Sequence, residues 1–183
     1  MHRIMGVDPP ASRNLGWCVF DVTAAPRLEQ SGIYRLQHSG DARLRDIKGL
    51  LSSVFRDFEG ISTLVLEKSI VGDFGKVTIE IAEGAGVMKL FALESGIEIV
   101  EVSPTDVRRM LLGEPFGTKG MINSLVKDRF FRFSSVKSLG GPTWEHRADA
   151  IGLVVTHLLL GRISVPTTHS VDLEPPGTTS DDR

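Results

Sequence analysis

The sequence predicts an α/β domain built on a mixed sheet, and two observations support this. The first third of the chain holds three short, partly alternating apolar segments close together, which is typical of antiparallel strands joined by hairpins. Further along, short apolar runs alternate with segments of helical periodicity, which is typical of strands joined by crossover helices. We therefore expect three antiparallel strands, then parallel strands, with helices covering the sheet.

The first three segments predict a meander. Residues 3–7 form an apolar run, and residues 16–22 form a second one, GWCVFDV, after a loop. Pro9, Pro10 and Asn14 in this loop are typical turn formers. Residues 29–37 alternate loosely, and we expect them to form the third strand.

A helix and a fourth strand follow. Residues 41–58 place apolar side chains at helical spacing, with Asp41 as the expected N-cap. Residues 63–66 then form a short apolar strand that ends on Glu67.

The next helix contains an unusual pair of glycines. It is predicted over residues 74–95 and is followed by a fifth strand over residues 97–103. Gly84 and Gly86 each lower helix stability by about 1 kcal/mol relative to alanine. We interpret them as positions of close packing, either within the fold or across a dimer.

Three helices complete the domain. Ser103, with Pro104 at the first helical position, predicts the start of a helix over residues 103–112. Residues 118–131 and 141–161 form the last two, and the final one carries a dense apolar stripe.

Composition places the chain among ordinary globular proteins. Its 183 residues fit one domain, with 41% hydrophobic and 24% charged residues. We expect residues 1–166 to form the domain, and residues 167–183, rich in Pro, Ser, Thr and acids, to be a disordered acidic tail. The net charge of −2 argues against a nucleic-acid partner only at first sight, because the tail holds four of the acids and a near-neutral body can still cluster its basic residues.

The remaining composition points to a reducing compartment. Cys18 is the single cysteine, so no internal disulfide is possible, and we expect it to be a small buried strand residue. No apolar run is long enough to cross a bilayer, and a strand begins so early that we expect no signal peptide.

Three carboxylates and a histidine fall at the ends of predicted elements. Asp8 ends the first strand, Glu67 ends the fourth, and Asp149 lies early in the last helix, three residues after His146. Residues three apart share a helix face. Oxygen ligands with one nitrogen suit Mg²⁺ or Mn²⁺, and a divalent cation would offset the repulsion between clustered acids.

Each of these residues also has a simpler structural interpretation. Asp8 before two prolines fits a turn, Glu67 beside Lys68 fits a solvated strand end, and His146 with Asp149 fits an exposed helix pair. The metal-site interpretation is favoured because one fold would bring all of them together.

In this order, the motifs resemble the RuvC family of Holliday junction resolvases, which are RNase H-like nucleases. IMGVDPPASRNLGW is similar to the opening motif of the family, LVLEKSIV to its second motif, and HRADAIGLVVTHLL to its closing helix. SPTDVRRMLLGEPFGTKGMI is similar to the middle region. The resemblance runs from about Arg3 to about Leu160, and four ordered motifs are more specific than any one alone.

The chain departs from the family pattern at several positions. Pro10 stands where the family has glycine, and His146 takes the place of the earlier of two helix aspartates. The motif around Lys119 lacks an alanine. We interpret Glu145 as a helix N-terminal charge rather than an extra ligand.

The resemblance implies a five-stranded RNase H-like sheet and a structure-selective endonuclease of branched DNA. It implies two Mg²⁺ ions, with Mn²⁺ as a substitute. Asp8 would bridge the ions, Glu67 and Asp149 would hold one each, and His146 would ligate or orient the attacking water. It further implies a homodimer acting on four-way junctions in the cytoplasm of a bacterium or a phage-infected cell, with an organelle left open.

Residues 104–149 hold eight basic side chains against five acids, which favours contact with phosphates. Lys119 is the residue the family motif selects. The resemblance also places Ile70 where the family has a residue that wedges into the junction. The expected DNA-binding residues are Lys119, Arg108, Arg109, Lys127 and Ile70.

Three other functions remain open from the sequence. A related nuclease could act on RNA or flaps, and a derived scaffold could bind junctions without cutting them. An actin-like kinase fragment is disfavoured, because its phosphate-binding turn needs glycines where this chain has Pro9 and Pro10.

Overall fold

The computed structural model describes residues 1–9, 13–68, 76–131 and 144–163. Within them, five strands form one sheet: β1 (Arg3–Asp8), β2 (Asn14–Asp21), β3 (Arg27–Arg35), β4 (Ile61–Glu67) and β5 (Glu98–Val102). Five helices accompany them: α1 (Ala42–Asp57), α2 (Lys76–Glu94), α3 (Pro104–Leu112), α4 (Lys119–Phe131) and α5 (Trp144–Ile163). The expected tail, residues 167–183, lies outside the described residues.

The sheet has the order β3-β2-β1-β4-β5, so β1 is its central strand. β1 pairs antiparallel with β2, and β2 pairs antiparallel with β3. β4 runs parallel to both β1 and β5. The predicted mixed sheet of a meander followed by parallel strands is therefore confirmed.

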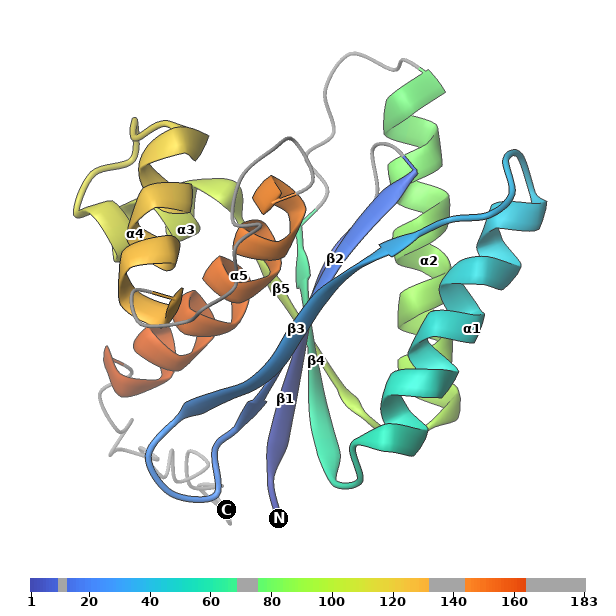
Figure 1. The fold of residues 1–183 in the computed structure, drawn as a ribbon, viewed down its shortest axis with the longest axis horizontal. Helices are drawn as coiled ribbons and strands as arrows, with labels where there is room; N and C mark the ends of the chain where they lie inside the picture. The colour runs from blue at the N-terminus through green and yellow to red at the C-terminus, as the bar shows by residue number, and fades with distance from the viewer. Residues whose placement is uncertain (10–12, 69–75, 132–143, 164–183) are drawn as a thin grey trace, which may run out of the picture.

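Helices cover both faces of this sheet (Figure 1). α1 and α2 lie on one face, and α5 crosses the other face with α3 and α4 packed outside it. Strand alternation divides the core accordingly. Met5 and Val7 of β1 join the cluster beneath α1 and α2, whereas Ile4 joins the cluster beneath α5.

Two glycines on the α5 face allow this helix to lie unusually close to the sheet. A Cβ atom on Gly6 would overlap the carbonyl oxygen of Ala150, and one on Gly16 would overlap that of His146. Because neither glycine has a side chain, the first turns of α5 rest directly on β1 and β2.

The helix ends match the sequence unevenly. Ser103 caps α3 by accepting a hydrogen bond from the backbone N–H of Asp106, as predicted. Asp41 stands at the N-cap position of α1, but its side chain makes no capping hydrogen bond, so that prediction is wrong in its chemistry. A Cβ atom on Gly86 would have no neighbour within 4 Å, so the structure shows no close packing there within the fold, and packing across a dimer stays a prediction.

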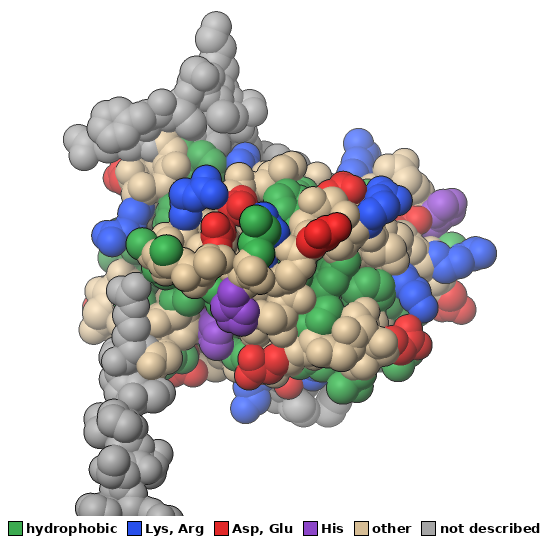
Figure 2. Space-filling model, turned by 90° about the horizontal axis from the view of Figure 1, so that it is seen from below, with side chains coloured by type: hydrophobic (Ala, Val, Ile, Leu, Met, Phe, Trp, Pro, Cys, Tyr) green, Lys and Arg blue, Asp and Glu red, His purple; other side chains and the backbone are tan. Residues whose placement is uncertain are grey.

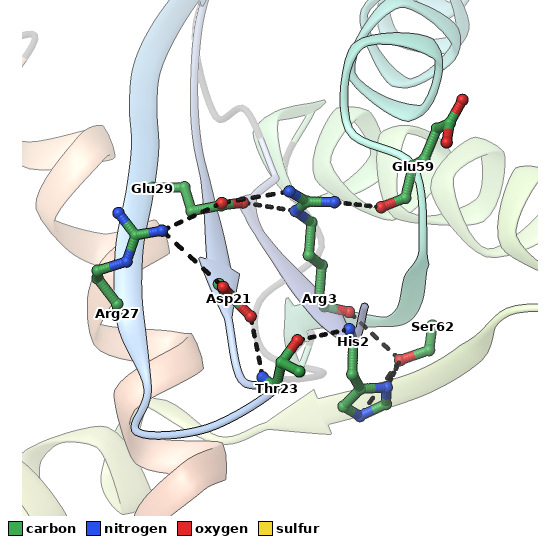
Figure 3. Close-up of polar contacts among 8 residues, drawn as sticks. All are labelled: His2, Arg3, Asp21, Thr23, Arg27, Glu29, Glu59 and Ser62. Atoms are coloured by element: carbon green, nitrogen blue, oxygen red, sulfur yellow. Dashed lines mark hydrogen bonds and ion pairs between the residues drawn. The ribbon is translucent and has the colours of Figure 1, made fainter.

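A polar cluster closes the end of the sheet where β1 and β4 begin (Figure 3). The Arg3 side chain is 11% exposed, and it donates to the Glu29 carboxylate on β3 and to the carbonyl oxygen of Glu59 before β4. Arg27 adds ion pairs to Asp21 and Glu29. In the view of this end, positive and negative side chains are interspersed (Figure 2).

Among the residues that the structure describes, none of the helices combines the length and the apolar character needed to span a membrane.

Candidate active site

Asp8 and Glu67 lie next to each other because of the register between β1 and β4. Val7 pairs with Leu66 in this parallel ladder, so the next residues on the two strands are neighbours. Alternation directs both carboxylates to the α5 face, since Val7 and Leu66 point to the other face. Asp8 is only 7% exposed, and Glu67 is half-buried. The expected pair of acids at adjacent strand ends is present.

The N-terminal turns of α5 bring two further groups to these acids. Nδ1 of His146 lies 2.8 Å from Oδ2 of Asp8. Asp149 follows three residues later on the same helix face, and its side chain is 10% exposed. The close approach at Gly16 holds this helix end against β2. Asp8, Glu67, His146 and Asp149 therefore gather at one end of the sheet.

Lys119, the first residue of α4, supplies a positive charge to this group. Its Nζ lies 3.1 Å from Oδ2 of Asp149. Glu67, Arg108, Lys119 and Asp149 line one small hollow, of about 20 Å³, between α3, α4 and α5. Two of the expected DNA-binding residues, Lys119 and Arg108, thus border the acids directly.

Crowding and burial make the acids of the site harder to ionise. Burial, followed by the charges of Asp8 and Asp149, raises the pKa of Glu67 to about 7, and the nearby cations of Lys119 and Arg108 offset only part of this. Burial and the charge of Asp8 also raise the pKa of Asp149. The protein alone does not neutralise all of the negative charge that it gathers here.

The cationic partners respond in the opposite sense. The hydrogen bond to Asp8 raises the pKa of His146 above its ordinary value. Burial lowers the pKa of Lys119, but the Asp149 carboxylate, aided by Asp8 and Glu67, outweighs burial, and the net shift is upward. Both shifts favour the protonated forms of these groups beside the acids.

The donor set fits a divalent metal in its chemistry. Three carboxylates and one imidazole are suitable ligands for Mg²⁺ or Mn²⁺, and the raised pKa values of Glu67 and Asp149 show that added positive charge would be favourable. In the described part of the chain, however, no three of these groups are arranged around one point as ligands of an ion. His146 and Lys119 instead contact the carboxylates.

The other expected DNA-binding residues lie outside this group. Arg109 is exposed and pairs with Asp106 on its own helix, at 3.4 Å. Lys127 is exposed on α4, two turns beyond Lys119. Ile70 lies outside the described residues. Glu145 is exposed, which agrees with its interpretation as a helix N-terminal charge.

Arg147 is a residue whose role the sequence did not reveal. Its Nε donates to Oγ of Ser31 on β3 at 2.7 Å, and its guanidinium lies 4.7 Å from the ring centre of Phe131 and 5.4 Å from that of Trp144. It therefore ties the turn that carries His146 to the edge strand of the sheet. Its partner on β3 is 116 residues away in the sequence, and no local pattern announces the pairing.

A second, open hollow of about 510 Å³ lies beside this contact. It runs from Pro26, just before β3, along this strand to Ser31 and reaches the last turn of α4. Arg27, Arg129 and Arg147 line it together with Glu29, so positive charge predominates there.

The sheet order and the acids at its strand ends define the RNase H-like fold, and comparisons with solved structures confirm it. RuvC of Thermus thermophilus in complex with a Holliday junction substrate superposes with a TM-score of 0.69 at 19% identity, covering 90% of this chain and 97% of that one. The yeast mitochondrial Holliday junction resolvase superposes with a TM-score of 0.63 at 10% identity, covering 86% and 78% of the two chains.

Sequence comparison identifies the family. Residues 4–157 match the family of the crossover junction endodeoxyribonuclease RuvC. The relative from Cereibacter sphaeroides is 27% identical over 157 residues, covering 85% of this chain and 88% of the relative. The one from Paracoccus denitrificans is 28% identical over 160 residues, covering 85% and 90%. The chain belongs to the RuvC family of crossover junction endodeoxyribonucleases.

Proposed function

We propose that this protein resolves four-way DNA junctions by metal-dependent hydrolysis of phosphodiester bonds. The supporting observation is the convergence of Asp8, Glu67, His146 and Asp149 at one end of the sheet, in a member of a family of junction endonucleases. Three carboxylates gathered at the ends of adjacent strands and the start of a helix are typical of a centre for phosphoryl chemistry.

We infer that Asp8, Glu67 and Asp149 hold two Mg²⁺ ions, which Mn²⁺ can replace. Bound there, such ions would lower the pKa of the attacking water and stabilise the charge on the leaving 3′ oxygen. The raised pKa values of the two flanking acids support this, because a cation would offset the burial and the repulsion between carboxylates that raise them.

The remaining side chains would bind and orient the substrate. His146, held by its hydrogen bond to Asp8, is placed to ligate an ion or to orient the attacking water. Lys119 pairs with Asp149, and a metal on Asp149 would leave the Lys119 ammonium group available for a phosphate oxygen. Arg108 borders the same hollow and would contact a neighbouring phosphate.

We further propose that the protein acts as a homodimer in the cytoplasm, with one site for each of two strands. The support is the outer surface of α2, on which Ile79, Leu90 and Leu93 are 53%, 55% and 68% exposed. A helix surface this apolar is typical of one that a partner covers.

Cleavage of a synthetic four-way junction tests the function. We expect the protein to cut it in Mg²⁺ and not in chelator, and to cut a duplex, a flap and an RNA hairpin far more slowly. Asp8→Asn should bind the junction with unchanged affinity in chelator and lose cleavage by at least about a thousandfold. Full cleavage by Asp8→Asn would contradict the site, and preference for the flap or RNA would contradict the substrate.

A further inference from the structure

Phe116 is the most exposed large hydrophobic side chain in the described part of the protein, at 89%. It lies in the loop between α3 and α4, close in sequence to the site residue Lys119. We propose that Phe116 is a substrate-positioning residue that stacks on an unpaired base of the bound strand. This inference rests on the proposed function and identifies how that site recognises an opened base.

The loop that carries the ring is anchored at both of its ends. Gly113 ends α3 with φ of 78°, and its N–H donates to the carbonyl oxygen of Arg109. Gly117 is buried against Leu112, where any Cβ would overlap the leucine side chain. Oγ1 of Thr118 accepts from the N–H of Met121 at the start of α4. A ring on such a loop is presented to solvent with little backbone freedom to lose on binding.

The distance between the Phe116 ring and the acids limits how far from the cut phosphate the stacked base can be. Phe116 precedes Lys119 by three residues, so their Cα atoms lie within about 11 Å of each other. Lys119 in turn contacts Asp149 through its ammonium group. Successive bases of one strand are about 3.4 Å apart in a helix. The lysine side chain adds about 6 Å and its contact to Asp149 another 3.1 Å, so Phe116 lies within about 20 Å of this acid. The base that meets Phe116 is therefore within about six nucleotides of the phosphate that is cut.

The chemistry of the ring selects an unpaired base. Phenylalanine has no hydrogen-bonding group, so it cannot read base edges, but every base offers a face for stacking. In a continuous duplex these faces are covered by neighbouring pairs, whereas a base that leaves the stack at the branch point exposes its face. The basic side chains of Arg108 and Lys119 beside the loop would hold the strand by its phosphates while the ring contacts a base.

The test uses the full chain carrying Asp8→Asn, bound to a four-way junction with 2-aminopurine placed at each position within about six nucleotides of the cut. Stacking should quench the fluorescence at one position on binding. Phe116→Ala should abolish this quench and weaken binding roughly five- to hundredfold. Phe116→Trp should retain both, and Phe116→Leu, which keeps apolar surface but has no ring, should behave like alanine. Met121→Ala, which removes a nearby side chain 46% exposed, is the matched control and should change neither.

Two outcomes would overturn the inference: unchanged quench and affinity in Phe116→Ala, or a Leu variant equal to wild type. The proposed function is judged separately, by cleavage with the Asp8 side chain intact. If the protein cuts junctions and Phe116→Ala changes neither the quench nor the affinity, the proposed function is supported and the stacking proposal is refuted. If the quench depends on Phe116 but the protein does not cut the junction in the presence of metal, the stacking proposal is supported and the proposed catalysis is refuted.

Discussion

The pKa of Glu67 reflects both the burial of its carboxylate and the negative charge gathered at the site. Glu67 is half-buried beside two other carboxylates, and its pKa of about 7 lies well above the ordinary value of 4.5. In the metal-free protein the folded state therefore binds a proton on Glu67 more tightly than the unfolded chain does. The contribution of this residue must disfavour folding as it ionises.

Glu67→Gln should consequently make the metal-free protein more stable at pH 8. The native state holds more protons than the unfolded state between about pH 4.5 and pH 7, so wild-type stability falls as the pH rises through this window. The full shift corresponds to about 3 kcal/mol, and screening of this partly exposed group reduces the expected gain to about 1–2 kcal/mol. Urea unfolding in chelator at pH 8 and pH 4 measures the gain, which should vanish at the lower pH. An equal gain at both pH values would contradict an electrostatic cause.

Cys18 is a second group whose pKa is raised by burial, here without other titratable groups of the site beside it. It is fully buried beneath α5, its Sγ donates to the carbonyl oxygen of Ala150, and burial raises its pKa to about 12. We expect iodoacetamide at pH 8 to modify the folded protein at least about a hundredfold more slowly than the urea-unfolded chain. Mass spectrometry of timed samples checks this, and rapid modification of the folded form would contradict the burial.

For single residues, the sequence predicts where side chains lie on strands and helices better than it predicts which side chains contact one another. Asp8, Glu67, His146 and Asp149 were found because strand ends and helix spacing are local properties. The pairing of Lys119 with Asp149, across 30 residues, could not be found, because which cation reaches which acid depends on how α4 packs on α5.

Among the elements, α5 determines whether a site exists at all. It contributes His146 and Asp149, and it contacts all five strands. The close packing of α5 on the sheet depends on Gly6 and Gly16, because the lack of side chains there leaves room for the helix backbone. Arg147 fixes the same end of the helix to β3.

Gly16→Ala should therefore lower the free energy of unfolding by about 2–4 kcal/mol, because a methyl group would overlap backbone atoms of His146 that cannot move without shifting the helix. Gly49→Ala is the control, since Gly49 is exposed in α1 with no neighbour within 4 Å. It should raise stability by about 0.5–1 kcal/mol. Urea titrations of both variants give the comparison, and a Gly16→Ala protein as stable as wild type would contradict the close contact.

The elements themselves were largely predictable, and the exceptions have physical reasons. The strands and helices were identified within a few residues because apolar periodicity follows directly from burial. Asp41 was misjudged as a capping side chain, because the sequence suggests a cap position but does not set the backbone angles that a cap needs, and here Asp41 is already helical. The sequence does not predict the close packing of α5 on two glycines, because a glycine in a strand gives no indication of which element packs against it.

For the whole molecule, basic side chains are concentrated on particular surfaces, although the chain as a whole has no excess of positive charge. The chain has a net charge of −2, yet Arg108 and Lys119 border the acids, and Arg27, Arg129 and Arg147 line the second hollow. At the opposite end of the sheet, positive and negative groups are mixed (Figure 2). DNA binding should therefore be local and salt-dependent despite the overall negative charge.

Arg108→Gln should weaken junction binding at low salt and reduce the slope of log K against log salt by about 1. Arg56→Gln removes a charge from α1, far along the chain from the site helices, where Arg56 is 76% exposed beside Asp57, and it should leave the slope unchanged. Fluorescence anisotropy from 50 to 300 mM salt, about the physiological range, measures both slopes. Equal slopes for wild type and Arg108→Gln would show that this residue does not contact phosphate.

The parallel pairing of β1 with β4 has a consequence for synthesis of the chain. Asp8 is synthesised early, Glu67 follows after β2, β3 and α1, and α5 comes from the last part of the described chain. A nascent chain thus carries only Asp8 and Glu67 of the four groups until α5 has been synthesised. The capacity to cut DNA should appear in one late step, after the rest of the sheet is already folded.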